Sequence, residues 1–463
     1  MKKPNLLFLF ADQWRRNAIG FMNKEEVLTP NLDNFSKEAM TFTNAYSTCP
    51  LCSPSRATIL TGKYPISHGV ITNCKPNLDN VYLKENEITI GDVLKKEGYS
   101  TGYIGKWHLD DPEAQNGNTP ISGAKNWDAY TPPGPKRHGF DFWYSYGADD
   151  NHFTPHYWNN SPEQIKVNKW SVEHETDIAL DFISKNKDDN FALFVSWNPP
   201  HTPLDQIPQE YVDLYKDIDI KIRENVVLDN IIDHPKTIEP FSFTREKYID
   251  MVKRYYGAIT GIDINFQRII KYLKDNNLFE DTIVVVTADH GEMLCSHGLW
   301  SKHVWYDESL SVPFIVSYGN NIKYGFNETV LSGVDIMPTL LSILNINIPN
   351  SVEGKDLSLA FQGNYIENTA VTMCYPGNQN LIKTLKKEGK NPLAYGWRSV
   401  ISKDETYVYF NSYDSKSPQE EFIYKNKEDE YQLNPIYLDK NENKWRGILK
   451  TWAENFKDPI FKK

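Results

Sequence analysis

The sequence of 463 residues is short of positive charge, of cysteine and of long apolar runs. Lys and Arg number 50 against 61 Asp and Glu, a formal net charge of −11. This balance argues against a nucleic-acid partner, because such proteins concentrate Lys and Arg. No window approaches the roughly 18 uninterrupted apolar residues of a membrane span, so we expect no membrane partner. A disordered chain is excluded by the aromatic content of 13%. What remains is an acidic globular protein whose length is typical of an enzyme with more than one domain.

The sequence also lacks the cysteine pattern of a disulfide-rich protein and the apolar run of a secretory leader. An odd cysteine count at irregular spacing is a poor disulfide framework. The apolar run of residues 6–11 is shorter than the roughly 7–15 residues of a secretory h-region, and Asp12 ends it. We therefore expect a strand here, in a protein that is cytoplasmic, or periplasmic or secreted if a leader has been removed. The five cysteines are Cys49, Cys52, Cys74, Cys295 and Cys374.

Short apolar runs alternate with amphipathic segments along the chain. A helix is predicted over residues 33–40, and an apolar repeat over residues 262–273 predicts a second one. This alternation predicts an α/β fold with a mainly parallel sheet sandwiched by helices. From about residue 366 the pattern becomes strand-like with turns, so we predict a catalytic domain over 1–365 and a smaller α+β subdomain over 366–463. Four runs have the near-continuous apolar character of buried parallel strands: residues 5–11, 191–197, 282–288 and 313–317.

Polar residues follow three of these runs. Asp12 and Gln13 follow the first, residues 198–201 the second and residues 289–292 the third. Because ligands of open α/β sheets bind beyond the carboxyl ends of the strands, these groups are predicted to converge on one site. The segment from about 110 to 165 is rich in Pro, Gly and aromatic residues, and we interpret it as the ordered wall of a cleft.

Two adjacent segments carry the most specific signal. Residues 52–58 read CSPSRAT and residues 60–65 read LTGKYP. Together they resemble the C-x-P-x-R signature and the T-G segment of the type I sulfatases, which have the alkaline-phosphatase-like fold. Further blocks resemble that family in the same order, at residues 4–12, 29–33, 98–108, 287–292, 334–339 and 353–357.

The resemblance implies a modified nucleophile. In that family a separate formylglycine-generating enzyme acts on the unfolded signature and oxidises its cysteine, which here is Cys52. The hydrated aldehyde is a gem-diol: one oxygen attacks sulfur, and the second hydroxyl expels sulfate as the aldehyde re-forms. The resemblance also implies one Ca²⁺ ion, a hard cation that prefers oxygen ligands. Its implied ligands are Asp12, Gln13, Cys52, Asp289 and His290.

This metal set departs from many sulfatases at two positions. Gln13 stands where a second Asp is usual, which removes one negative charge, and His290 stands where other members have Asn. Both substitutions resemble a bacterial subgroup that includes choline sulfatases and several sugar sulfatases. His290 would bind the metal through a neutral ring nitrogen or contact the diol instead.

The resemblance also implies roles for single residues outside the metal set. Arg56, Lys106 and Lys302 resemble the cationic clamp of the family, and His108 resembles the residue that deprotonates the diol as sulfate leaves. His201 is the better candidate for the general acid, since the histidine pKa lies near working pH. The predicted substrate-binding residues are Arg15, His68, Asp149, Asn151 and His303.

Carboxylates and amides pair well with sugar hydroxyls, so the expected substrate is a sulfated saccharide, a small molecule or an oligosaccharide, with galactose or N-acetylgalactosamine favoured. Two alternatives stay open. One is a phosphonate or phosphate ester hydrolase of the same superfamily, since sulfate and phosphate esters share geometry. The other is a protein that binds sulfated glycans without turnover, against which the intact set of catalytic residues argues.

Overall fold

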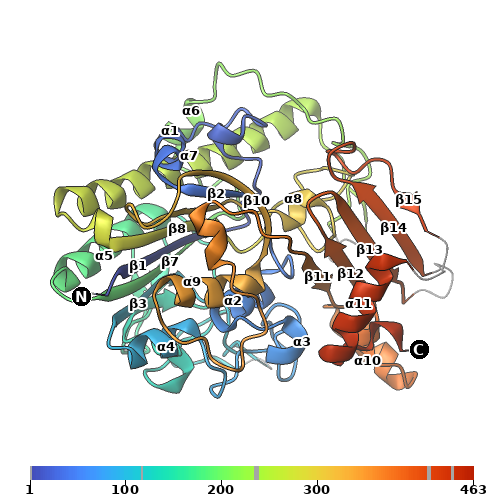
Figure 1. Cartoon of the computed structure of the whole chain (residues 1–463), viewed down its shortest axis with the longest axis horizontal. Helices are drawn as coiled ribbons and strands as arrows, with labels where there is room; N and C mark the ends of the chain where they lie inside the picture. The colour runs from blue at the N-terminus through green and yellow to red at the C-terminus, as the bar shows by residue number, and fades with distance from the viewer. Residues whose placement is uncertain (1–2, 116–117, 234–238, 414–418, 439–442, 463) are drawn as a thin grey trace.

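The centre of the molecule is one large sheet covered on both faces by helices (Figure 1). The computed structural model of the chain describes residues 3–115, 118–233, 239–413, 419–438 and 443–462. Eight strands lie in the order β10-β2-β9-β8-β1-β7-β3-β4. Their bounds are β1 Asn5–Asp12, β2 Met40–Tyr46, β3 Ser100–Lys106, β4 Phe142–Tyr146, β7 Phe191–Pro200, β8 Thr282–Ala288, β9 Phe314–Ser317 and β10 Gly325–Ser332.

The predicted α/β class is confirmed, with one correction to strand direction. β1 pairs in parallel with β7 and β8, and every residue of these three strands is buried. The fourth predicted strand, β9, is instead antiparallel to both β8 and β2. Its four residues are all buried, and a strand covered on both faces is continuously apolar whichever way it runs. Composition therefore predicted the strand but not its direction.

The helices form a layer on each face of the sheet (Figure 1). One layer holds α1 Pro30–Phe35, α5 Ser171–Asn186 and α7 Arg245–Asp275, and the other holds α2 Cys52–Thr61, α4 Ile90–Lys96 and α9 Ile336–Ile343. The predicted apolar repeat lies on α7, whose first turn is capped by the Thr244 side chain. Short helices are α3 Pro65–His68, α6 Gln209–Asp213 and α8 Asp307–Leu310, and a small hairpin joins β5 His156–Tyr157 to β6 Ile165–Lys166.

The helix predicted over residues 33–40 lies further toward the N-terminus. It begins at Pro30, whose fixed φ suits the first helical position. A 3-10 turn follows at Ser36–Glu38, and Met40 already starts β2. Ala39 is extended and buried, so the chain leaves the helix to enter the sheet.

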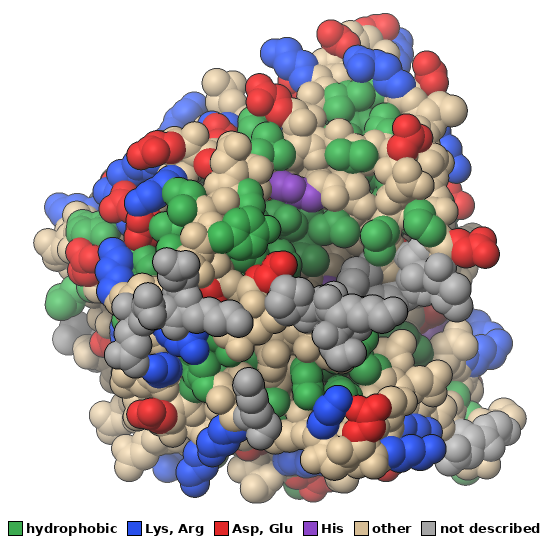
Figure 2. Space-filling view, turned by 90° about the vertical axis from the view of Figure 1, so that its right-hand side faces the viewer, with side chains coloured by type: hydrophobic (Ala, Val, Ile, Leu, Met, Phe, Trp, Pro, Cys, Tyr) green, Lys and Arg blue, Asp and Glu red, His purple; other side chains and the backbone are tan. Residues whose placement is uncertain are grey.

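Five strands of the C-terminal region form a second sheet, which is antiparallel in the order β11-β12-β13-β14-β15. This agrees with the α+β subdomain of the predicted fold class, and the domain bounds of 1–365 and 366–463 stay a prediction. Figure 2 looks onto this side of the molecule, where apolar side chains gather between charged ones. Among the described helices, none is long and apolar enough to span a membrane. The elements are β11 Ala370–Cys374, α10 Gln379–Lys387, β12 Gly396–Ile401, β13 Glu405–Asn411, β14 Glu420–Lys425, β15 Ile436–Tyr437 and α11 Lys444–Asn455.

Candidate active site

The carboxyl ends of the central strands deliver the polar groups that the sequence placed there. Asp12 ends β1, Lys106 ends β3, and Asp289 follows β8 directly. The first turn of α2 approaches the same edge and carries Cys52 at its first residue. Four separate segments therefore meet at one point, as the sheet rule for ligand sites predicts.

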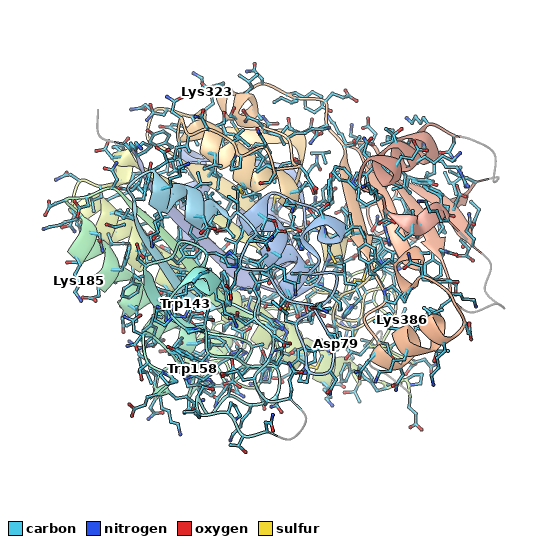
Figure 3. The ribbon with its side chains drawn as sticks, turned by 90° about the horizontal axis from the view of Figure 1, so that it is seen from below. Asp79, Trp143, Trp158, Lys185, Lys323 and Lys386 are labelled. Atoms are coloured by element: carbon cyan, nitrogen blue, oxygen red, sulfur yellow. The ribbon has the colours of Figure 1, made fainter. Side chains whose placement is uncertain are left out.

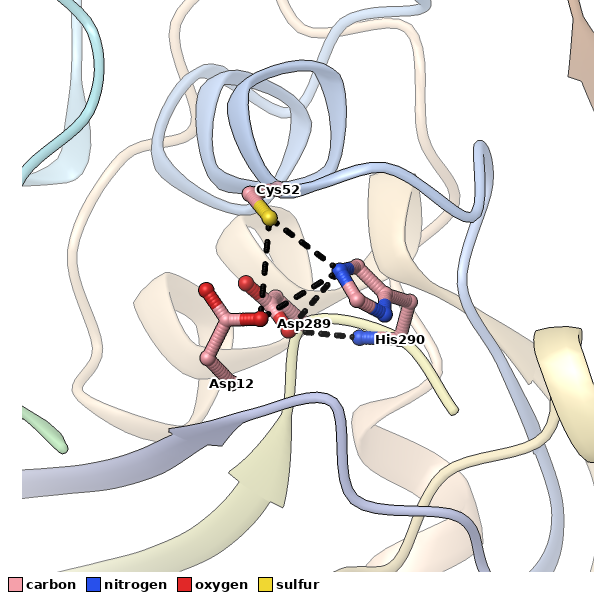
Figure 4. Close-up of side chains that lie close together, drawn as sticks. All are labelled: Asp12, Cys52, Asp289 and His290. Atoms are coloured by element: carbon pink, nitrogen blue, oxygen red, sulfur yellow. Dashed lines mark hydrogen bonds and ion pairs between the residues drawn. The ribbon is translucent and has the colours of Figure 1, made fainter. Parts of the chain in front are cut away.

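Four of these side chains form a tight buried cluster (Figure 4). One ligand atom from each of Asp12, Cys52, Asp289 and His290 lies within 4.8 Å of the others. Cys52 Sγ is 3.5 Å from Asp12 Oδ1 and 3.3 Å from His290 Nε2. Two carboxylates, an imidazole and the side chain of residue 52 make a donor set that fits one divalent cation.

Buried cations surround this cluster. The Arg56 guanidinium lies 3.0 Å from Asp289 Oδ2 and 3.2 Å from Asp12 Oδ2, and Lys106 Nζ lies 2.7 Å from Asp12 Oδ2. Burial by itself would raise the pKa of Asp12, but Lys106 and the neighbouring cations hold that pKa well below its usual range. The pKa of Asp289 is raised, because burial and the charge of Asp12 both oppose its ionisation. A bound divalent cation would relieve that cost.

Cys52 lies at the positive end of α2, next to Lys302. Lys302 Nζ is 3.6 Å from Cys52 Sγ. Burial and the charge of Asp12 raise the pKa of the Cys52 thiol, but Lys302 and Lys106 outweigh them and bring it well below its usual range. The position therefore stabilises a negative charge on the side chain of residue 52.

Gln13 is engaged with protein groups outside the cluster of four. Its side-chain oxygen accepts a hydrogen bond from Lys302 Nζ at 2.5 Å, and its amide nitrogen donates to Glu292. The residue has a φ of 70°, in the left-handed region. The structure thus places Gln13 as the partner that orients Lys302. Glu292 was not singled out from the sequence, although it belongs to the block that follows β8.

Two histidines line a cavity of about 850 Å³ that reaches Cys52. His201 Nδ1 lies 2.6 Å from the carbonyl oxygen of Thr202 and 3.3 Å from the Asp150 carboxylate, so Nδ1 carries the hydrogen. That leaves Nε2 of His201 for exchange of a proton. His108 Nε2 lies 3.1 Å from the carbonyl oxygen of Cys74. Both histidines line the cavity together with Cys52, Lys106 and Lys302.

The sequence profile of the sulfatase family matches residues 4–346. The chain belongs to the sulfatase family. A second profile, N-sulphoglucosamine sulphohydrolase, C-terminal, matches residues 295–452 of this sulfatase.

An endo-4-O-sulfatase of Bacteroides thetaiotaomicron is 32% identical, over 95% of this chain and 89% of that protein. An ulvan-active sulfatase of Formosa agariphila is 36% identical, over 77% of this chain and 64% of its own. The relatives carry the family's activity, so the sulfatase is a sulfuric ester hydrolase.

Solved structures agree with this assignment. A Bacteroides fragilis protein assigned as a sulfatase superimposes with a TM-score of 0.86 at 34% identity, over 99% of this chain and 97% of its own. A Silicibacter pomeroyi phosphonate monoester hydrolase, at 21% identity and a TM-score of 0.71, covers all of this chain and 96% of its own. The second likeness shows the shared alkaline-phosphatase-like fold.

The predicted substrate-binding residues divide into two groups. Asp149, Asn151 and His303 line the cavity of the sulfatase. Arg15 and His68 lie outside its lining: Arg15 is 2% exposed and forms a 2.8 Å ion pair with Glu25, and His68 is buried behind α2. Burial lowers the pKa of His68 to about 3, so this ring is neutral. Both side chains hold the structure behind the site.

One residue of the predicted polar segment 198–201 connects two parts of the site. Asn198, in β7, accepts a hydrogen bond from Lys106 Nζ at 2.9 Å and donates to the Asp149 carbonyl. It thus ties Lys106 to the segment of Asp149, which lines the same cavity. The aromatic segment supplies part of the cavity wall, as predicted, although most of its rings are buried packing residues. Unpredicted lining residues include Thr72, Asn73, Lys75, Trp127, Phe153 and Gly377.

Proposed function

We propose that this sulfatase hydrolyses an O-sulfate ester of a carbohydrate, with a formylglycine derived from Cys52 as nucleophile and one Ca²⁺ as cofactor. The observation that carries the proposal is the position of residue 52. Its side chain lies 3.3–3.6 Å from groups of His290, Asp12 and Lys302 at the end of the cavity. A maturing enzyme would have to act before folding, since Cys52 is 2% exposed.

The cluster defines what a cation would do here. Asp12, Asp289, His290 and the side chain of residue 52 would hold it, and when bound it would polarise the nucleophile and the sulfate oxygens. Arg56 pairs with both carboxylates and fixes them, and its charge opposes the rise that burial causes in the pKa of Asp289. Gln13 is a weaker candidate, because its oxygen accepts the Lys302 hydrogen bond.

The remaining steps are assigned to residues of the chain. Lys302 Nζ is placed to stabilise negative charge on the side chain of residue 52. His201, with its hydrogen held on Nδ1, would carry a second proton on Nε2 and give it to the sugar oxygen as the ester bond breaks. His108 would take the proton from residue 52 that allows sulfate to leave.

The saccharide assignment is supported by the cavity wall and by the relatives. Asp149, Asn151 and Gln206 offer hydrogen-bonding groups, and Trp127 and Phe153 offer aromatic surface. This mixture suits a sugar ring, which has hydroxyl edges and apolar faces. The named activities of relatives on 4-O-sulfate and on ulvan point to the same class.

The nucleophile is tested by Cys52→Ala, with Cys295→Ala as the matched control. Both cysteines are buried, and Cys295 lies outside the cluster. Sulfate release from N-acetylgalactosamine 4-O-sulfate should be abolished in the first variant and kept in the second. Mass spectrometry of the peptide containing residue 52 should show the aldehyde in the wild type. Retained turnover in Cys52→Ala would overturn the assignment.

The cofactor and the ester class need separate assays. Chelation should remove activity, and Ca²⁺ should restore it; full activity in chelator would contradict the metal site. Sulfate, phosphate and phosphonate esters with the same leaving group should be compared. Faster turnover of the phosphorus esters would favour the alternative hydrolase, whereas binding of sulfated glycans without turnover by aldehyde-bearing protein would favour a binding role.

A further inference from the structure

The C-terminal subdomain supplies part of the cavity wall. Gly377 lines the cavity, and its carbonyl oxygen accepts a hydrogen bond from Lys75 Nζ at 2.5 Å. A Cβ at residue 377 would lie 2.5 Å from Thr72 Oγ1, so the two segments are in direct contact. Two residues later α10 begins, and the Gln379 side chain donates to the carbonyl oxygen of Asn77. The first turn of α10 therefore sits at the cavity rim.

One face of α10 is a row of exposed lysines. Lys383, Lys386 and Lys387 stand at positions i, i+3 and i+4, which lie on one side of a helix. All three are exposed, whereas Leu385 is buried. No carboxylate in the described parts of the chain lies within 4.0 Å of any of the three. The row continues from the Gln379 side of the helix, so it leads outward from the rim over about 12 Å.

Helix stability alone does not account for this face. Lys386 and Lys387 lie in the last turn, where positive charges interact favourably with the negative end of the helix dipole. However, Lys383 and Lys387 form a like-charge i,i+4 pair, which weakens a helix. The face also stands out against the formal net charge of −11. Asp79, on the loop that α10 contacts, lies on the same side of the molecule as Lys386 (Figure 3). Glu388, which follows the helix, forms its 2.7 Å ion pair with Lys390 instead of with the three lysines.

We propose that the α10 lysine face, formed by Lys383, Lys386 and Lys387, binds the anionic groups of a polyanionic saccharide chain whose esterified residue occupies the cavity. This inference rests on the proposed function and narrows its substrate class. A chain bearing sulfates or uronic acids would run from the cavity past Gly377 and along α10. The enzyme would then prefer such a chain to a single sulfated sugar, because only the chain reaches the lysines.

The test compares two substrates in two triple variants. The variant K383Q/K386Q/K387Q removes the face, and K96Q/K185Q/K187Q removes three exposed lysines near the ends of α4 and α5. Lys185 lies at the opposite end of the molecule from Lys386 (Figure 3). Sulfate release is measured from a chondroitin 4-sulfate oligosaccharide and from N-acetylgalactosamine 4-O-sulfate. Melting temperatures check that both variants fold.

We expect kcat/KM for the oligosaccharide to fall about tenfold at low salt in the α10 variant, with the monosaccharide and the control variant unchanged. The difference should shrink at about 0.15 M salt, where charges are screened over roughly 8 Å. An unchanged ratio of the two substrates overturns the inference while leaving the sulfatase activity intact. Binding of the wild type to phosphatidylserine vesicles, with that ratio unchanged, would assign the face to a membrane instead. If the wild type hydrolyses neither sugar, the proposed function fails and this inference fails with it.

Discussion

Removing the Arg56 guanidinium should destabilise the protein strongly, and Arg56→Met tests this. Arg56 is 1% exposed and contacts two fully buried carboxylates. Asp12 would keep Lys106 at 2.7 Å. Asp289 Oδ2 would lose its ion pair, while Oδ1 keeps the backbone N–H groups of Gln13 and His290. The variant therefore removes the guanidinium partner of a buried carboxylate and leaves it His290 Nε2, 3.6 Å from Oδ1, as an ion-pair neighbour.

Breaking one buried ion pair costs about 3–5 kcal/mol, so we expect the free energy of unfolding to fall by about 4 kcal/mol. Urea unfolding in chelator, followed by tryptophan fluorescence, measures it. Added Ca²⁺ should recover more stability in the variant than in the wild type, because it would supply a cation to Asp289. A loss under about 1 kcal/mol would refute the claim that Asp289 depends on Arg56 for its charge.

Arg398→Met is the matched control for this variant. Arg398 and Asp458 form an ion pair at 3.0 Å, and both side chains are fully buried in the C-terminal subdomain. This variant should lose a comparable amount of stability, about 3–5 kcal/mol. Its response to Ca²⁺ should nevertheless equal that of the wild type, since it leaves the cluster of Asp12 and Asp289 untouched. If Ca²⁺ recovered the same amount of stability in both variants, the recovery would not depend on the cluster of Asp12 and Asp289. That result would contradict the prediction for Arg56→Met.

Two further predictions concern neighbouring features. Gly105→Ala should lower the free energy of unfolding by about 3 kcal/mol and displace the adjoining Lys106. Residue 105 has a φ of 91°, and an added Cβ would clash with the Ser196 carbonyl oxygen. Thermal unfolding would measure the loss of stability. Burial lowers the pKa of His156, but the Asp128 and Asp149 carboxylates raise it from 6.5 to about 9. Because this pKa is higher in the folded state, His156 contributes its full stability below about pH 6.5 and loses it as pH rises through 9. The stability advantage over His156→Gln should therefore shrink across that range, and a constant advantage would contradict the charged pair.

The sequence predicted the strands that are buried on both faces and missed those with mixed composition. β1, β7 and β8 are continuously apolar, so their pattern was clear. β2 includes Asn44 and two threonines, and β3 has glycines at 102 and 105. Such residues weaken a strand signal, and the pairing partners that stabilise these strands are distant in sequence.

The residues of the candidate site also differ in how far the sequence predicts them. Residues within motifs, such as Asp12, Cys52 and Asp289, were placed correctly in one cluster. Lys75 and Gly377 carry no local signal, because they line the cavity only after distant segments pack together. Arg15 shows the opposite case: its place beside Asp12 suggested substrate contact, but its side chain turns to the buried Glu25.

The order of strands in the sheet sets when the segment around Cys52 becomes fixed during synthesis. β2, which leads into α2, lies between β9 and β10. Those neighbours belong to residues 314–332, so 317 − 52 = 265 residues must be translated after Cys52 before β9, the first partner of β2, is complete. At about 5–20 residues per second the delay is roughly 13–53 s. During this delay β2 has no strand partner, so the segment around Cys52 would stay accessible to the proposed maturing enzyme while the chain is on the ribosome. A circular permutant that starts with β9 and β10 would shorten the delay.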